Sequence, residues 1–217
     1  MNLIDYLRIL ARRGWIILLA VILTAGAGYV FSKVLTPTYR STQKVLIKPA
    51  RNDFGLTQVL RQLMYSYTTR INTQARATEA IDALKLDMTP DQLQPMVNAV
   101  PDLNTLTINI DVTMKDGEVA NRVAQVYGLN FIEWRNQANQ PLRLEDRIDA
   151  ELLDSPTYEL FQPKTSVNVA AGALLGILIG GIVVFVLEYL DSNVVRRASD
   201  VERYLQLPVL GSLPEAQ

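Results

Sequence analysis

Two long apolar runs divide this chain of 217 residues into three more polar parts. The stretch WIILLAVILTAGAGYVFS, residues 15–32, and the stretch VNVAAGALLGILIGGIVVFVL, residues 167–187, contain no charged residue. Each has about the length of a helix that crosses a hydrocarbon core ~30 Å thick. We therefore predict transmembrane helices over 15–35 and 165–188. They leave an N-terminal segment, 1–14, a central domain, 36–164, and a C-terminal tail, 189–217.

The first apolar run also resembles the hydrophobic part of a cleaved signal peptide. However, the run is long, and Lys33 follows it without the small-residue pattern of a cleavage site. We therefore expect an uncleaved anchor. In the segment before it, Leu3, Ile4, Leu7 and Leu10 share one helical face while Asp5, Arg8 and Arg12 share another. This pattern predicts a short amphipathic helix at the membrane surface.

Basic residues beside the two apolar runs predict the orientation of the chain. Arg8, Arg12 and Arg13 precede the first run and Arg196 and Arg197 follow the second, whereas Lys33, Arg40 and Lys164 are spread over the other side. By the positive-inside rule both termini are cytoplasmic, so residues 36–164 form one extracytoplasmic domain.

The central domain shows both periodicities of regular structure. Alternation predicts strands over 39–48 and around 106–112, and a final extended piece over 147–153. Helical spacing predicts a helix over 55–86 with a break in its polar middle, and a second amphipathic helix capped by Asp116. Thr89 and Gln92 form a capping box for a short helix that begins with Pro90. The predicted fold class is an α+β membrane protein whose two transmembrane helices enclose a small α/β extracytoplasmic domain, with its first and last strands in one sheet.

Small residues recur at every fourth position in both apolar runs. Gly172, Gly176 and Gly180 form one stripe, and Ala20, Thr24, Gly28 and Ser32 form the other. Such stripes let helix backbones approach closely, although glycine is also simply common in membrane helices. We expect specific helix packing, either within one chain or between chains.

The composition excludes several kinds of chemistry. There is no Cys and no His, and 21 basic residues face 22 acidic ones, so thiol nucleophiles, the usual metal sites and a basic nucleic-acid surface are not expected. No GxxxxGK[ST] stretch occurs in the printed chain, so we expect no nucleotide cofactor. Tyr127 and Trp134 could stack on a sugar, but their place on an apolar helical stripe favours the core.

Three basic residues, Arg40, Lys44 and Lys48, share one side of the first strand because side chains on a strand alternate. They could meet anionic lipid headgroups or an anionic polymer. The alternative is the solvated face of an edge strand protected by lysine.

The segment LEYLDSNVVRRASDVERYLQLPVLGSLP, residues 187–214, resembles the end of the second membrane span in the chain length determinant family, the polysaccharide co-polymerases of bacterial surfaces. LIDYLRILARRGWIILL, PTYRSTQKVLI, LTINIDVTMKDGEVANRVAQVYGLNFIE and DSPTYELFQPK resemble the family in the same order. The resemblance implies a non-enzymatic homo-oligomer, often a ring, in the bacterial plasma membrane. Beside a polymerase or exporter, it sets the chain length of capsule, exopolysaccharide or O-antigen (lipopolysaccharide). The chain is too short for the long protruding helix of larger members, and it resembles the short members that activate a separate tyrosine kinase.

The tail is where such a kinase would bind. Ser199 and Glu202 form a capping box for a short helix, and an apolar strip at 207–213 follows it. By resemblance, we expect the docking residues to be Arg196, Arg197, Asp200, Leu207, Pro208, Val209, Leu210 and Leu213. Alternatively, the strip folds back on its own helix or on the bilayer. Two other functions stay open at this point: an extracytoplasmic sensor, and an adaptor subunit of an export complex.

Overall fold

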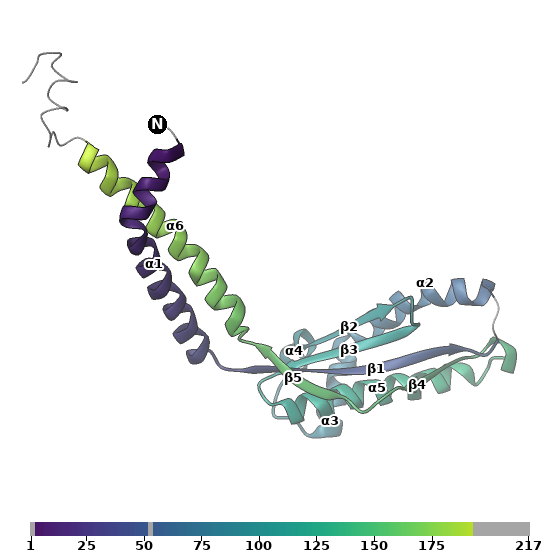
Figure 1. The fold of residues 1–217 in the computed structure, drawn as a ribbon. Coiled ribbons are helices and arrows are strands. Elements are labelled where there is room, and N and C mark those ends of the chain that lie inside the picture. Colours follow the sequence, from purple (N-terminus) through teal and green to yellow (C-terminus); the bar gives the residue numbers. More distant parts are fainter. Residues whose placement is uncertain (1–2, 52–53, 193–217) are drawn as a thin grey trace, which may run out of the picture. The chain divides into compact units, whose positions relative to one another are not determined.

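The computed structural model describes residues 3–51 and 54–192 and divides the chain into two units. One unit contains the N-terminal part up to Val34 together with the part from Lys164 onward, and the other contains residues 35–163. The first holds helices α1 (Leu3–Val34) and α6 (Thr165–Ser192), and the second is an α/β domain (Figure 1). Residues 3–14, for which the sequence predicts a surface helix, are the first part of the continuous helix α1.

The α/β domain contains both strands and helices. Its elements are β1 (Thr38–Pro49), α2 (Phe54–Ile71), α3 (Gln74–Leu84), α4 (Pro90–Leu93), β2 (Val97–Asp102), β3 (Thr107–Met114), α5 (Gly117–Asn139), β4 (Ile148–Leu152) and β5 (Thr157–Gln162). Short 3-10 turns cover Gln94–Met96 and Leu144–Asp146. The predicted strands and helices are present at or close to their expected positions.

The five strands form one antiparallel sheet with the order β2-β3-β1-β4, in which β5 also pairs with β1. β3 lies along one side of β1, while β4 and β5 share its other side, β4 along residues 45–49 and β5 along residues 38–42. The first and last strands therefore share a sheet, as predicted. β1 lies in the interior of the sheet, so the interpretation of its lysines as protection of an edge strand is wrong.

The two faces of the sheet differ because side chains on β1 alternate. Val45 and Ile47 are fully buried on the face covered by helices, whereas Lys44 and Lys48 are exposed on the opposite face. On that opposite face, Lys48 pairs with Glu151 of β4, and the Arg40 guanidinium lies 3.5 Å from the Phe161 ring centroid. The three basic residues thus share one side of the strand, as predicted.

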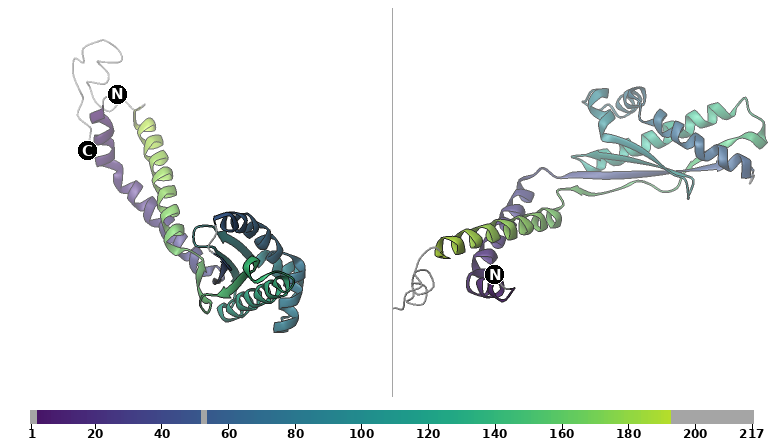
Figure 2. Two further views of the ribbon diagram at one scale, coloured as in Figure 1. Left: turned by 90° about the vertical axis from the view of Figure 1, so that its right-hand side faces the viewer. Right: turned by 90° about the horizontal axis from the view of Figure 1, so that it is seen from above.

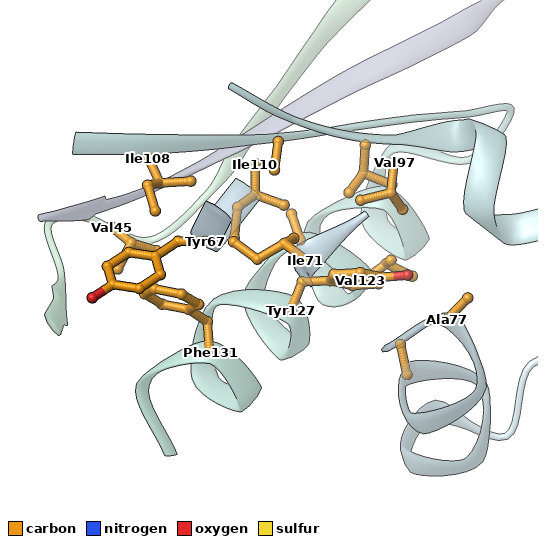
Figure 3. Packing of buried hydrophobic residues seen from close by; sticks show 14 of the residues in the cluster. Val45, Tyr67, Ile71, Ala77, Val97, Ile108, Ile110, Val123, Tyr127 and Phe131 are labelled. Carbon is orange, nitrogen blue, oxygen red and sulfur yellow. The ribbon is translucent and has the colours of Figure 1, made fainter. Parts of the chain in front are cut away.

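The core of the domain lies between the sheet and the helices α2 and α5 (Figures 2 and 3). Figure 3 shows side chains of both helices directed toward those of the strands. Core residues on the helices include Ile71, Tyr67, Val123, Tyr127 and Phe131, and core residues on the strands include Val45, Val97, Ile108 and Ile110. Burial of these apolar side chains is the main stabilising contribution to the domain.

Local capping sets two of the helix boundaries. The Asp116 carboxylate accepts hydrogen bonds from the amides of Glu118 and Val119, at 2.9 and 3.2 Å, and so begins α5. The Thr89–Gln92 capping box begins α4, as predicted. A carboxylate at a helix N-terminus satisfies free amides and interacts favourably with the helix dipole.

The helix predicted over 55–86 breaks at Asn72 and Thr73, between α2 and α3. The Asn72 side-chain oxygen accepts a hydrogen bond from the Ala99 amide at 2.9 Å, and the Gln94 side chain donates to the Asn72 carbonyl at 3.0 Å. The break therefore attaches the helices to the outer edge of β2. Sequence reasoning missed β2 and β5, because β2 is short and contains Pro101, and because most of β5 is exposed.

Candidate functional site

Two features of the described residues carry functional information: the helix pair α1–α6 and a polar recess on the α/β domain. Both helices are long and apolar enough to cross a membrane, over Arg12–Val34 and Thr165–Asp191. They pack along each other in Figures 1 and 2. Their outward residues, such as Leu23, Leu174 and Phe185, are more than 60% exposed. Such residues are suited to contact with lipid.

The predicted small-residue stripes face each other within one chain. A Cβ on Gly172 would lie 2.5 Å from the Thr24 carbonyl oxygen, and one on Gly180 would lie 2.7 Å from the Ile17 Cα and 3.2 Å from the Ala20 Cβ. A Cβ on Gly176 would lie 2.6 Å from the Val21 Cα. These distances are below the usual contact of about 3.5–4.0 Å between carbon atoms, so only glycine permits this approach.

The same contact continues toward the α/β end of the helices. A Cβ on Gly28 would lie 2.7 Å from the Asn168 carbonyl oxygen, and the Ser32 and Thr165 hydroxyls lie 2.8 Å apart. The Thr24 hydroxyl donates to the carbonyl of Ala20 on its own helix, at 2.8 Å. Hydroxyls that are bonded locally can be placed between apolar helices at little cost.

An ion-pair cluster joins the N-terminal part of α1 to the C-terminal part of α6. The Arg13 guanidinium lies 3.4 Å from the Glu188 carboxylate and also pairs with Asp191. Sequence reasoning used Arg13 only for orientation and missed this cluster. A signal was available, because Arg12 and Arg13 precede the first apolar run and Glu188 and Asp191 follow the second.

The eight residues predicted to dock a kinase, Arg196, Arg197, Asp200, Leu207, Pro208, Val209, Leu210 and Leu213, lie outside the described residues.

The second feature is a hollow of about 490 Å³ on the α/β domain, bordered by the end of α2, by α3 and by α5. We call it the α3–α5 recess, and its lining residues are Arg70, Arg76, Glu79, Asp82, Asn130, Glu133, Trp134 and Gln137. Arg76 and Glu79 form an ion pair at 2.6 Å, and the Asn130 amide donates to Glu79 at 3.5 Å. Sequence reasoning predicted none of these polar residues as a site, because they come from three separate helices.

One aromatic residue, Trp134, lines the recess, and it packs against further aromatic residues of the core. Trp134 is partly buried, and its ring lies 5.6 Å from the rings of both Tyr67 and Phe131. Tyr127 is buried, and its pKa is raised mainly by this burial and further by the nearby Glu79 carboxylate. The core placement predicted for Tyr127 and Trp134 is confirmed, while Trp134 also borders the recess.

Two guanidinium groups lie near the Trp134 ring. Arg70 lies 4.4 Å from its centroid at the surface, and the buried Arg135 lies 5.3 Å from it. Arg135 donates hydrogen bonds to the Ile148 carbonyl at 3.0 Å and to the Asn139 side chain at 2.9 Å. A guanidinium can be buried when its N–H groups are hydrogen-bonded. The hydrogen bond from Arg135 to the Ile148 carbonyl also joins α5 to β4.

The chain is similar to proteins of bacterial capsule biosynthesis. Residues 1–86 match the family model described as chain length determinant protein. The capsular polysaccharide biosynthesis protein CpsC of Streptococcus pneumoniae is 28% identical, over 98% of this chain and 94% of that protein. The probable capsular polysaccharide biosynthesis protein YwqC of Bacillus subtilis is 28% identical, over 91% of this chain and 82% of its own length. The capsular polysaccharide type 5 biosynthesis protein cap5A of Staphylococcus aureus is 25% identical, over 83% of this chain and 81% of that protein.

Proposed function

We propose that this chain is a member of the chain length determinant family and regulates the length of the chains of a capsular or related surface polysaccharide. The observation that carries the proposal is the similarity to capsule biosynthesis proteins over nearly the whole chain, together with the family match at residues 1–86. The two apolar helices agree with a membrane protein of this family.

The test is the length distribution of the surface polysaccharide. Deletion of the gene is expected to change that distribution on a gel or by size-exclusion chromatography, and the intact gene supplied in trans is expected to restore it. An unchanged distribution in the deletion strain would refute the proposal. The total amount of polysaccharide serves as the control that separates length from synthesis.

We further propose that both termini lie in the cytoplasm and residues 36–164 lie outside the plasma membrane. The arginines that flank the apolar runs support this orientation. The pairing of Arg13 with Glu188 and Asp191 supports the placement of both termini on the same side. Because the chain has no cysteine, a single Gln125→Cys substitution reports on one side only. A membrane-impermeant maleimide should label Cys at 125 in intact cells, whereas Gln217→Cys should need permeabilisation. The reverse pattern would contradict the orientation.

The role we propose is that of an oligomeric, non-enzymatic scaffold beside a polymerase or exporter. The family supports a regulatory rather than a catalytic role, and the sequence lacks the two residues, Cys and His, that most often act as nucleophile and general base. Electron microscopy of the purified chain should show a symmetric ring. Particles that contain only one or two copies would contradict this part of the proposal.

We also propose that the tail activates a separate cytoplasmic tyrosine kinase through the strip at 207–213. The apolar residues Leu207, Val209, Leu210 and Leu213 support it, because such a strip is usually covered by a partner. Deletion of residues 207–217 is expected to abolish stimulation of kinase autophosphorylation in a mixture with the cognate kinase. Deletion of residues 215–217 alone is the matched control and should keep stimulation. Full stimulation by the longer deletion would disprove docking.

A further inference from the structure

The α3–α5 recess is lined almost entirely by polar side chains. Seven of its eight lining residues are charged or carry an amide, and the eighth is Trp134. Its lining contains three carboxylates, from Glu79, Asp82 and Glu133, and two guanidinium groups, from Arg70 and Arg76. The recess therefore offers many donors and acceptors with one surplus negative charge.

This composition argues against three kinds of ligand. A nucleic acid or another polyanion would be repelled by the surplus negative charge. An apolar ligand would need a mostly hydrophobic lining. The centre of a protein interface is depleted in charged residues, so a second copy of this chain is a poor match as well.

The same composition suits a sugar. Carboxylates, guanidinium groups and amides can each bond two adjacent hydroxyls with their paired acceptors or donors. Glu133 and Gln137 lie one helical turn apart on α5 and are joined only by a 3.5 Å hydrogen bond, so both can turn toward a ligand. The ring of Trp134 can pack against the C–H face of a pyranose ring.

A smaller niche adjoins the recess. It has a volume of about 10 Å³ and is bordered by Ile71, Tyr127 and Phe131 together with residues of the recess. A space of this size holds one group about as large as a water molecule. The methyl of an N-acetyl group has that size and would meet the apolar side chains there.

We infer that the α3–α5 recess binds a neutral glycan segment and prefers sugars that carry an N-acetyl group. The inference rests on the proposed function and names the part of the chain that would contact the polymer. Arg70 has no ion pair within the described part of the chain and covers the Trp134 ring from the solvent side. It moves aside or donates to the sugar when the recess fills.

The chain contains only two tryptophans, which provides a direct assay. In the full-length protein with Trp15→Phe, Trp134 is the only tryptophan, so tryptophan emission comes from the recess alone. Titration with chitohexaose, a neutral oligomer of N-acetylglucosamine, should give a saturable change in its emission. Cellohexaose, which lacks the N-acetyl group, should bind about tenfold more weakly, since a filled apolar niche discriminates by about that factor. A hyaluronan hexasaccharide, which is anionic, should bind more weakly than chitohexaose.

Matched double variants on α5 test the residues. Glu133→Gln with Gln137→Ala changes two side chains of the recess, and Glu118→Gln with Gln125→Ala changes the same residue types at exposed positions outside it. The first is expected to weaken chitohexaose binding at least tenfold with an unchanged thermal transition, and the second to leave binding unchanged. The inference is overturned by the absence of any saturable change with chitohexaose, by tighter binding of hyaluronan, or by equal binding in both variants.

The two levels of proposal fail in different ways. If deletion of the gene leaves polysaccharide length unchanged, the proposed function is wrong. If deletion changes the polysaccharide length but the gene with Glu133→Gln and Gln137→Ala restores the length as well as the unaltered gene does, only the inferred glycan binding at the recess is wrong. A change in oligomer size caused by this double variant, with glycan binding retained, would identify the recess as a contact between copies and would also overturn the inference.

Discussion

Gly176 lies in the close contact between α1 and α6, and Gly176→Ala should force the two helices apart. The added Cβ would lie 2.6 Å from the Val21 Cα and 2.9 Å from the Ala20 carbonyl oxygen. Both are backbone atoms of a helix, so they cannot rotate away as the end of a side chain could. Restoring a carbon–carbon contact of about 3.6 Å requires the helices to separate locally by about 1 Å.

The magnitude follows from the contacts that this separation weakens. A gap of 0.5–1 Å removes about a quarter to a half of each dispersion contact, which is worth ~0.1–0.2 kcal/mol per pair of atoms. Summed over the neighbouring contacts between α1 and α6, the lost stabilisation is about 1–2 kcal/mol, within the usual range for an overpacked site. Gly181 is the matched control, because a Cβ there meets nothing within 4 Å. Gly181→Ala should leave the helix pair unchanged or slightly more stable, since alanine favours helix by up to about 1 kcal/mol.

Steric trapping measures this difference directly. Biotin attached through Lys33→Cys and Ser166→Cys, two exposed positions at adjoining ends of the helices, lets two bulky avidin molecules bind only when the helices separate. The free energy of separation should fall by about 1–2 kcal/mol for Gly176→Ala and should stay unchanged or rise slightly for Gly181→Ala. Equal values for the two variants would refute the close contact at Gly176.

Three further predictions concern single interactions. Arg13→Gln and Glu188→Gln, combined in a double-mutant cycle with the same trapping assay, should show a coupling of about 0.5–1 kcal/mol that weakens in high salt; zero coupling would mean that the pair adds nothing. Asp116→Ala should lower the free energy of unfolding by about 1 kcal/mol in urea denaturation, because the helix cap is lost. Asp116→Asn should keep most of the stability, because an amide oxygen can also cap the helix. Equal losses in the two variants would disprove the cap. Above pH 10 the unfolded chain loses the Tyr127 proton while the folded chain, with its raised pKa, keeps it, so stability should fall by up to about 1.4 kcal/mol per pH unit. Tyr127→Phe should flatten that decline, and an unchanged slope would contradict the burial of the phenol.

The sequence alone determined the features that depend on neighbouring residues. The two apolar helices follow from the length of uncharged runs, the strand over 39–48 follows from alternation, and the start of α5 follows from the cap at Asp116. The period of four in Gly172, Gly176 and Gly180 predicted a face for close packing. In each case the physical cause acts within a few turns of one element, so it is visible in the order of residues.

Only the tertiary structure decided which elements meet. It placed the two stripes against each other within one chain, although their spacing is equally compatible with packing between chains. It made β1 an interior strand, which changed the interpretation of Lys44 and Lys48, and it showed β2 and β5, whose residues have little periodicity of their own. The α3–α5 recess and the Arg135 hydrogen bonds join residues far apart in the chain. Their positions depend on long-range pairing and on the burial of the core, which no local pattern encodes.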